Sequence, residues 1–316
     1  MTATPEVSRR RAWVMAARPQ TLPAGGAPVI IGVALAVADG VFAIAPAVAA
    51  LVGALLIQVG TNFANDYYDA VNGADTDERE GFTRVTAGGL IDPSRVKLAM
   101  AGTYALAMVV GLYLVYVGGL PILVVGLSSI LAGVLYTGGP YPYGYRGLGD
   151  LFVFVYFGLV AVAGTYYVQA VVELGIEPLT LGVPAGTVTT ASLLAGVGAG
   201  ALSTCILVVN NIRDLETDRA SGKRTLAVML GYRLARAEFV GLLAVAYAVP
   251  VAFWLALGYS PAVLLPLLSV PLAAAIARVV VTRRDGDALN PALERTGQLL
   301  AVYALLFAAG FVAGVS

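Results

Sequence analysis

The chain has 316 residues, of which 59% are hydrophobic and 12% are charged, whereas about a quarter of the residues of a soluble domain are charged. This balance excludes an ordinary soluble domain and predicts a protein whose solvent is lipid. The net charge is zero, histidine is absent and Cys205 is the single cysteine, so a histidine base, a histidine metal ligand and an intrachain disulfide are excluded.

The first element expected is a retained cytoplasmic arm, residues 1–18, which carries four arginines. A single transmembrane domain, residues 19–316, follows it. A spanning helix needs about 20 mostly apolar residues. Nine stretches fit in chain order: 20–38, 42–64, 97–117, 120–137, 150–171, 189–211, 237–257, 261–281 and 296–314. The expected fold class is therefore all-α, a polytopic bundle of nine transmembrane helices with a cytoplasmic N-terminus.

The distribution of basic residues supports this topology. Nine spans with the arm inside place the loops around 65–96, 138–149, 212–236 and 282–295 in the cytoplasm. All 19 lysines and arginines fall in the arm, in these loops or at the adjoining helix ends. Such a bias sets the orientation of a membrane protein. We expect a multi-pass protein of the inner (plasma) membrane.

Acidic residues gather at two of the cytoplasmic helix ends, in residues 65–78 and 210–218. Residues four apart share one face of a helix, so Asn65 with Asp69, and Asp214 with Asp218, each present a pair of oxygen ligands. Mg²⁺ prefers oxygen ligands and is usually held by one or two carboxylates together with substrate phosphates. The predicted metal ligands are Asn65, Asp69, Asp75, Asn210, Asp214 and Asp218.

Basic residues close to the two clusters are suited to gripping a diphosphate. Arg84 follows the first cluster, and Arg213 and Lys223 flank the second. The alternative interpretation is that nearby charges such as Arg79, Arg224 and Arg233 are solvated and only enforce orientation.

Tyrosines lie on the same side of the membrane. Tyr67 and Tyr136 are the candidates to stabilise a developing cation with their ring faces. The alternative is an interfacial aromatic belt, which explains many such tyrosines.

These features favour a lipid diphosphate substrate, whose charged head would bind the clusters and whose tail would dissolve among the spans. With no histidine and no evident nucleophile, the expected reaction is ionisation of an allylic diphosphate, followed by attack of an electron-rich acceptor. The residues expected to be catalytic are Asp66, Asp69, Asp214, Asp218 and Lys223.

Four segments carry a resemblance to a known family: residues 18–23, 65–69, 136–150 and 211–228. With them the chain resembles, over nearly its whole length, the UbiA superfamily of intramembrane prenyltransferases, and within it the menaquinone branch. The resemblance implies a nine-helix bundle, a Mg²⁺ cofactor and two small-molecule partners, polyprenyl diphosphate and 1,4-dihydroxy-2-naphthoate. It further implies transfer of the polyprenyl chain with loss of the acceptor's carboxylate, giving demethylmenaquinone.

The first motif departs from the family pattern at one position, and the acceptor needs a partner of its own. The commoner family pattern has an acidic residue where this chain has Gly73, and Asp75 and Asp77 are the candidates to replace it. For the acceptor's carboxylate, we expect Arg146, in its tyrosine-rich loop, to be the partner.

Two other functions compete with this interpretation. One is prenyl transfer to another aromatic acceptor such as 4-hydroxybenzoate. The other is an ion-coupled transporter, in which membrane-embedded acids mark the ion path, although transporters hold such groups near the bilayer midplane. Membrane lipid is an expected partner, and nothing in the sequence points to nucleic acid.

Overall fold

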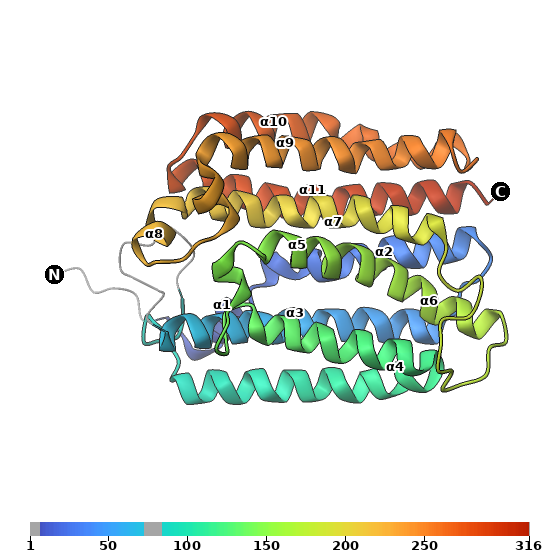
Figure 1. Ribbon diagram of the computed structural model, residues 1–316, viewed down its shortest axis with the longest axis horizontal. Helices are drawn as coiled ribbons and strands as arrows, with labels where there is room; N and C mark the ends of the chain where they lie inside the picture. The colour runs from blue at the N-terminus through green and yellow to red at the C-terminus, as the bar shows by residue number, and fades with distance from the viewer. Residues whose placement is uncertain (1–6, 73–83, 316) are drawn as a thin grey trace.

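The computed structural model describes residues 7–72 and 84–315, and in this part of the chain there are helices and loops but no strand. The all-α class is therefore confirmed. Figure 1 shows long helices lying side by side along one axis, with the short helix α8 at one end of the bundle. The helices are α1 Arg9–Ala17, α2 Leu22–Ala38, α3 Ile44–Val71, α4 Pro93–Leu135, α5 Gly149–Phe154, α6 Ala161–Glu173, α7 Thr190–Arg213, α8 Leu215–Ala220, α9 Leu226–Leu255, α10 Val270–Thr282 and α11 Gly286–Ala313.

Eight helical stretches in the described residues are long and apolar enough to cross a membrane. One of them joins α1 to α2, one joins α5 to α6 through a π-helical segment at Val155–Val160, and one joins a 3₁₀ segment at Pro261–Ser269 to α10. The chain is an integral membrane protein, as its composition predicts. The division into an arm and one membrane domain stays a prediction.

The longest stretch, α4, has 43 residues and is not one straight helix. Gly119 has a φ of 66° and a ψ of −153°, and the chain reverses direction there, so the two halves lie side by side in Figure 1. A side chain at Gly119 would collide with the backbone of Thr180, whose carbonyl accepts a hydrogen bond from the Leu120 amide at 2.9 Å. The halves match the expected spans 97–117 and 120–137. The count of nine spans, which treats them as separate crossings, stays a prediction, as does the orientation.

Glycines bring two helical segments into backbone contact at the centre of the bundle. A Cβ atom added to Gly158 would lie 2.5 Å from both the Gly196 carbonyl oxygen and the Gly200 Cα atom of α7. Small residues four apart allow such close approach between membrane helices. This contact fixes the Val155–Val160 segment, and hence α5 and the loop before it, against α7.

The acidic clusters lie on differently built backbones. Helix α3 continues to Val71, beyond the expected end at residue 64, so Asn65 and Asp69 are helical and share a face. Helix α7 ends at Arg213, and Asp214 lies between α7 and α8 with a non-helical ψ of 8°. The prediction that Asp214 and Asp218 share one face of a single helix is therefore wrong, although the Asp218 amide still donates to the Asp214 carbonyl at 2.7 Å.

Candidate active site

Asp69 is the best-connected residue of the first cluster. Its carboxylate is buried and accepts a hydrogen bond from Arg84 Nη2 at 2.5 Å. A second hydrogen bond comes from the hydroxyl of Tyr145. Charge-assisted hydrogen bonds of this kind are roughly twice as strong as neutral ones. The structure thus brings the expected metal ligand Asp69 and the expected phosphate-binding Arg84 together.

Asp66, one of the expected catalytic residues, accepts hydrogen bonds from the loop that follows the first cluster. One oxygen accepts from the Val85 amide at 3.2 Å, and the other from the Thr86 amide at 3.1 Å and from the Thr86 hydroxyl. Arg18 lies 4.0 Å away. Both oxygens of this buried carboxylate therefore anchor the loop that carries Arg84. Sequence spacing could not reveal this role, since it depends on how the loop returns to α3.

The second cluster is organised by Arg213. Its Nε and Nη2 atoms each donate to Asp214 at 2.7 Å, and its guanidinium also donates to the side-chain oxygens of Asn210 and Asn290, both at 2.9 Å. Arg213 is only 5% exposed. Arg213, an expected substrate-binding residue, orients Asp214 and Asn210 in the structure and ties them to α11.

Tyr145 connects the two clusters. Its hydroxyl contacts Asp69, and the Nζ atom of Lys223 lies 4.8 Å from the centroid of its ring. Lys223 in turn lies 3.7 Å from Asp218. The Tyr145 carbonyl accepts a hydrogen bond from the Arg224 amide at 2.8 Å, which holds the two loops together. The sequence alone does not identify Tyr145 as a site residue, because its loop contains three tyrosines and their spacing does not distinguish them.

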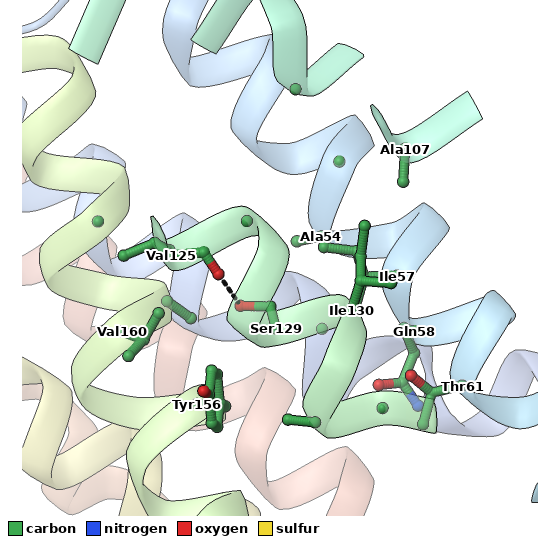
Figure 2. Close-up of a pocket in the computed structure, with 18 of the residues that line it drawn as sticks. Ala54, Ile57, Gln58, Thr61, Ala107, Val125, Ser129, Ile130, Tyr156 and Val160 are labelled. Atoms are coloured by element: carbon green, nitrogen blue, oxygen red, sulfur yellow. Dashed lines mark hydrogen bonds between the residues drawn. The ribbon is translucent and has the colours of Figure 1, made fainter. Parts of the chain in front are cut away.

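A cavity of about 460 Å³ opens among α2, α3, α4, α5 and α6. Figure 2 shows its mainly apolar wall, with Ile57, Ile130 and Val160 around it and Gln58 and Thr61 on α3. Asn65 and Tyr136 also line it, and Asn65 Oδ1 accepts a hydrogen bond from the Thr137 hydroxyl at 3.0 Å. The first cluster therefore reaches the cavity through Asn65.

Tyr136 follows the last residue of α4, and its ring fits between two glycines. A Cβ atom on Gly144 would lie 3.0 Å from this ring, and one on Gly149 would lie 3.4 Å from its hydroxyl. These contacts hold the ring in place at the wall of the cavity.

Two expected site residues, Tyr67 and Arg146, lie apart from this group in the described chain, and a third is not described. The ring centroids of Tyr67 and Tyr68 lie 5.0 Å apart, and Lys97 Nζ lies 5.7 Å from the centroid of the Tyr67 ring. Tyr67 does not line the cavity. Arg146 is exposed, with its guanidinium 4.2 Å from the centroid of the Tyr141 ring. Asp75 lies outside the described residues.

The donor set suits Mg²⁺ in chemistry, although no three carboxylate or thiol groups converge to hold a metal within residues 7–72 and 84–315. The oxygens of Asn65, Asp69, Asn210, Asp214 and Asp218 are the hard ligands that this ion prefers. They come from two places, α3 and the junction of α7 with α8. Ligands divided in this way suit an ion that completes its shell with water and phosphate oxygens.

Spanning helices, two cation-paired carboxylate clusters linked by Tyr145, and an apolar cavity that the first cluster reaches through Asn65 define a membrane protein with a charged site at one end of an apolar chamber. The sequence signature of the UbiA prenyltransferase family matches residues 26–302, and the chain belongs to this family. The expected resemblance is thus confirmed.

Curated relatives match along almost the full length. The 1,4-dihydroxy-2-naphthoate octaprenyltransferase of Mycobacterium tuberculosis is 39% identical, with 96% of this chain and 97% of the relative covered. The enzyme of the same name from Escherichia coli is 38% identical, with 96% of each covered. A UbiA homolog from Archaeoglobus fulgidus, solved bound to DMAPP and Mg²⁺, has a TM-score of 0.58 at 15% identity and covers 93% of this chain and 98% of its own. That likeness shows a shared fold.

Proposed function

We propose that this protein is a Mg²⁺-dependent prenyltransferase that transfers a polyprenyl chain from polyprenyl diphosphate to 1,4-dihydroxy-2-naphthoate. The observation that carries the proposal is the connection of the two clusters through Tyr145, the first of which reaches an apolar cavity through Asn65. Two relatives that share about 38–39% identity and carry this acceptor in their names support the choice of acceptor.

In this reaction the bond between C1 of the prenyl chain and the diphosphate oxygen breaks, and the diphosphate leaves with the electron pair. A ring carbon of the naphthoate forms the new carbon–carbon bond, and the carboxylate departs as carbon dioxide. This gives the prenylated naphthalene from which demethylmenaquinone derives. Bound Mg²⁺ would neutralise charge on the leaving diphosphate.

We assign separate roles in metal, diphosphate and acceptor binding to the residues of this chain. Asn65 with Asp69, and Asn210, Asp214 and Asp218, would hold the metal, with Asp75 an expected further ligand. Arg84 and Lys223, now paired with Asp69 and Asp218, would donate to diphosphate oxygens as these develop charge. Tyr136 would face the allylic cation with its ring. Arg146 is the expected partner of the acceptor's carboxylate.

We also propose that the site faces the cytoplasm, in the inner membrane. The support is the gathering of all 19 basic residues in the arm, four loops and adjoining helix ends, on the expected inner side. The clusters belong to the same side.

The test is a prenyl-transfer assay with the purified chain, radiolabelled polyprenyl diphosphate and Mg²⁺, with either 1,4-dihydroxy-2-naphthoate or 4-hydroxybenzoate. We expect labelled lipid product only with the naphthoate, and none after chelation with EDTA. Product only with the benzoate would overturn the acceptor assignment. No product with either acceptor would overturn the proposed function.

A further inference from the structure

Gln58 is a polar residue in the wall of the otherwise apolar cavity. It lies on α3, one turn before Asn62 and seven residues before Asn65, about 10 Å along the helix axis from the latter. Its side chain packs against α2, where a Cβ atom on Gly25 would lie 3.2 Å from Gln58 Cβ. The residue is 6% exposed. Figure 2 shows it beside Thr61, on this wall of the cavity.

Hydrogen bonds fix which way the Gln58 amide points. The hydroxyl of Thr21 donates its one proton to the Arg18 carbonyl at 2.9 Å, so the Thr21 oxygen is left to accept. It accepts from Gln58 Nε2 at 3.0 Å and from Asn62 Nδ2 at 2.8 Å. The nitrogen of Gln58 therefore faces Thr21, and its Oε1 atom faces elsewhere.

Gln58 Oε1 is buried and has no hydrogen-bond partner among the described residues. Of the described side chains that line the cavity, no other carries a buried polar atom in this state. A buried acceptor without a partner is costly, and a ligand that brings a donor removes that cost.

The chemistry of the two proposed substrates decides which one can bring that donor. A prenyl tail has no hydrogen-bond donor, and a diphosphate bound by cations offers only acceptor oxygens. A phenolic acceptor carries ring hydroxyls, and each of these is a donor. We infer that Gln58 Oε1 accepts a hydrogen bond from a ring hydroxyl of the aromatic acceptor and selects hydroxylated rings, an inference that rests on the proposed function.

The position of Gln58 agrees with this role. Gln58 and Asn65 line the same cavity, so a ring held at Gln58 shares this cavity with the first cluster. The Thr21 hydroxyl connects Gln58 to the segment at residues 18–21, so this segment acts through the amide to set its direction. Thr21 is a positioning residue, and Gln58 is the one that touches the acceptor.

The experiment is isothermal titration calorimetry of the full chain in detergent under anaerobic conditions. It measures the affinity for 1,4-dihydroxy-2-naphthoate, 1-hydroxy-2-naphthoate, 4-hydroxy-2-naphthoate and 2-naphthoate. The variant is Gln58→Met, which keeps the length of the side chain and removes its acceptor. We expect about tenfold weaker binding of the dihydroxy compound to the variant, the loss typical of one hydrogen bond. One of the two monohydroxy compounds lacks the hydroxyl that Gln58 binds. The native chain should bind this compound about as weakly as the variant binds the dihydroxy compound. The variant and the native chain should bind it with the same affinity.

Gln169→Met is the matched control. Gln169, on α6, also has a buried Oε1 without a partner in the described chain, but it does not line the cavity. This variant should bind all four compounds as the native chain does. In steady-state assays, Gln58→Met should raise the KM for the acceptor and leave the KM for the prenyl diphosphate unchanged.

Several outcomes would contradict the inference. Equal binding of the dihydroxy compound to Gln58→Met and to the native chain would overturn it, as would an equal loss for all four compounds, which indicates a general packing effect. If the native chain binds 4-hydroxybenzoate and no naphthoate, the proposed acceptor is wrong. The inference then stands only if the variant loses the preference for 4-hydroxybenzoate over benzoate. If the native chain binds no aromatic acid, both the proposed function and the inference are wrong.

Discussion

The hydroxyl of Tyr145 donates a hydrogen bond to the carboxylate of Asp69, although the two residues are 76 positions apart in the sequence. The same tyrosine ring lies 4.8 Å from the Lys223 ammonium, which pairs with Asp218. A single side chain thus touches the first cluster and the cation of the second. We therefore expect that a ligand bound at one cluster changes the contacts of the other.

Replacing Tyr145 with phenylalanine tests this connection. The change removes the hydroxyl that contacts Asp69 and keeps the ring below Lys223. A hydrogen bond to a charged group contributes about 1.5–3 kcal/mol, so kcat/KM for the prenyl diphosphate should fall about 10- to 100-fold in initial-rate assays. The control is Tyr141→Phe, since Tyr141 is exposed and its ring stacks on Arg146. Equal rates for the two variants would contradict the role of Tyr145.

Asp66→Asn should lower stability. The amide group of asparagine cannot accept the hydrogen bonds that the Val85 and Thr86 donors give to both carboxylate oxygens. Leaving a buried donor unsatisfied costs about 1–3 kcal/mol, which should appear as a lower Tm in thermal unfolding. Asp92→Asn is the matched control, because Asp92 is the exposed N-cap of α4 and asparagine caps helices equally well. An unchanged Tm in Asp66→Asn would show that the loop does not depend on this anchor.

Gly126→Leu should shorten the prenyl chain that the enzyme accepts. Gly126 lines the cavity, and no heavy atom lies within 4 Å of a Cβ added there. A leucine would occupy space that the tail needs, and a poorly fitting group in an apolar pocket costs about 10-fold or more in kcat/KM. The ratio of the rates with octaprenyl and geranyl diphosphates should fall accordingly. Gly102→Leu, at an exposed position of α4 outside the cavity, should leave the ratio unchanged. An equal fall of this ratio in both variants would contradict a role of Gly126 in limiting the length of the prenyl chain.

Gly158→Val should weaken the bundle. Its Cβ atom would lie 2.5 Å from backbone atoms of Gly196 and Gly200, which cannot move aside as a flexible side chain would. Overpacking of this kind typically costs about 1–3 kcal/mol, and we expect a lower Tm in detergent. Gly241→Val is the control, since no heavy atom lies within 4 Å of its added Cβ. If Gly158→Val has the same Tm as the control, the close contact between Gly158 and α7 does not contribute to stability.

The sequence predicted the membrane helices well, because lipid demands long apolar stretches that a pattern can reveal. It also predicted the break in α4, where Gly119 adopts a backbone conformation that favours glycine. The pairing of Asn65 with Asp69 followed from helical spacing alone.

The roles of individual polar residues depended on tertiary contacts that spacing does not encode. Asp66 and Asp69 are three residues apart on α3, yet the first anchors a loop and the second meets Tyr145. Arg213 and Arg146 are both basic residues at the charged end, but only the first is buried against Asp214. Gln58 stands in an expected span, and its free oxygen becomes apparent only once the Thr21 hydroxyl is placed.

In the proposed mechanism the two clusters form one diphosphate site. The most direct test is calorimetric titration of a non-ionising prenyl thiolodiphosphate with Mg²⁺ into the native chain, Asp69→Ala and Asp214→Ala. We predict that either substitution weakens binding at least about tenfold, since each removes a charged partner of the shared ligand. Binding of the native strength to either variant would show that one cluster suffices, and would contradict a single site built from both.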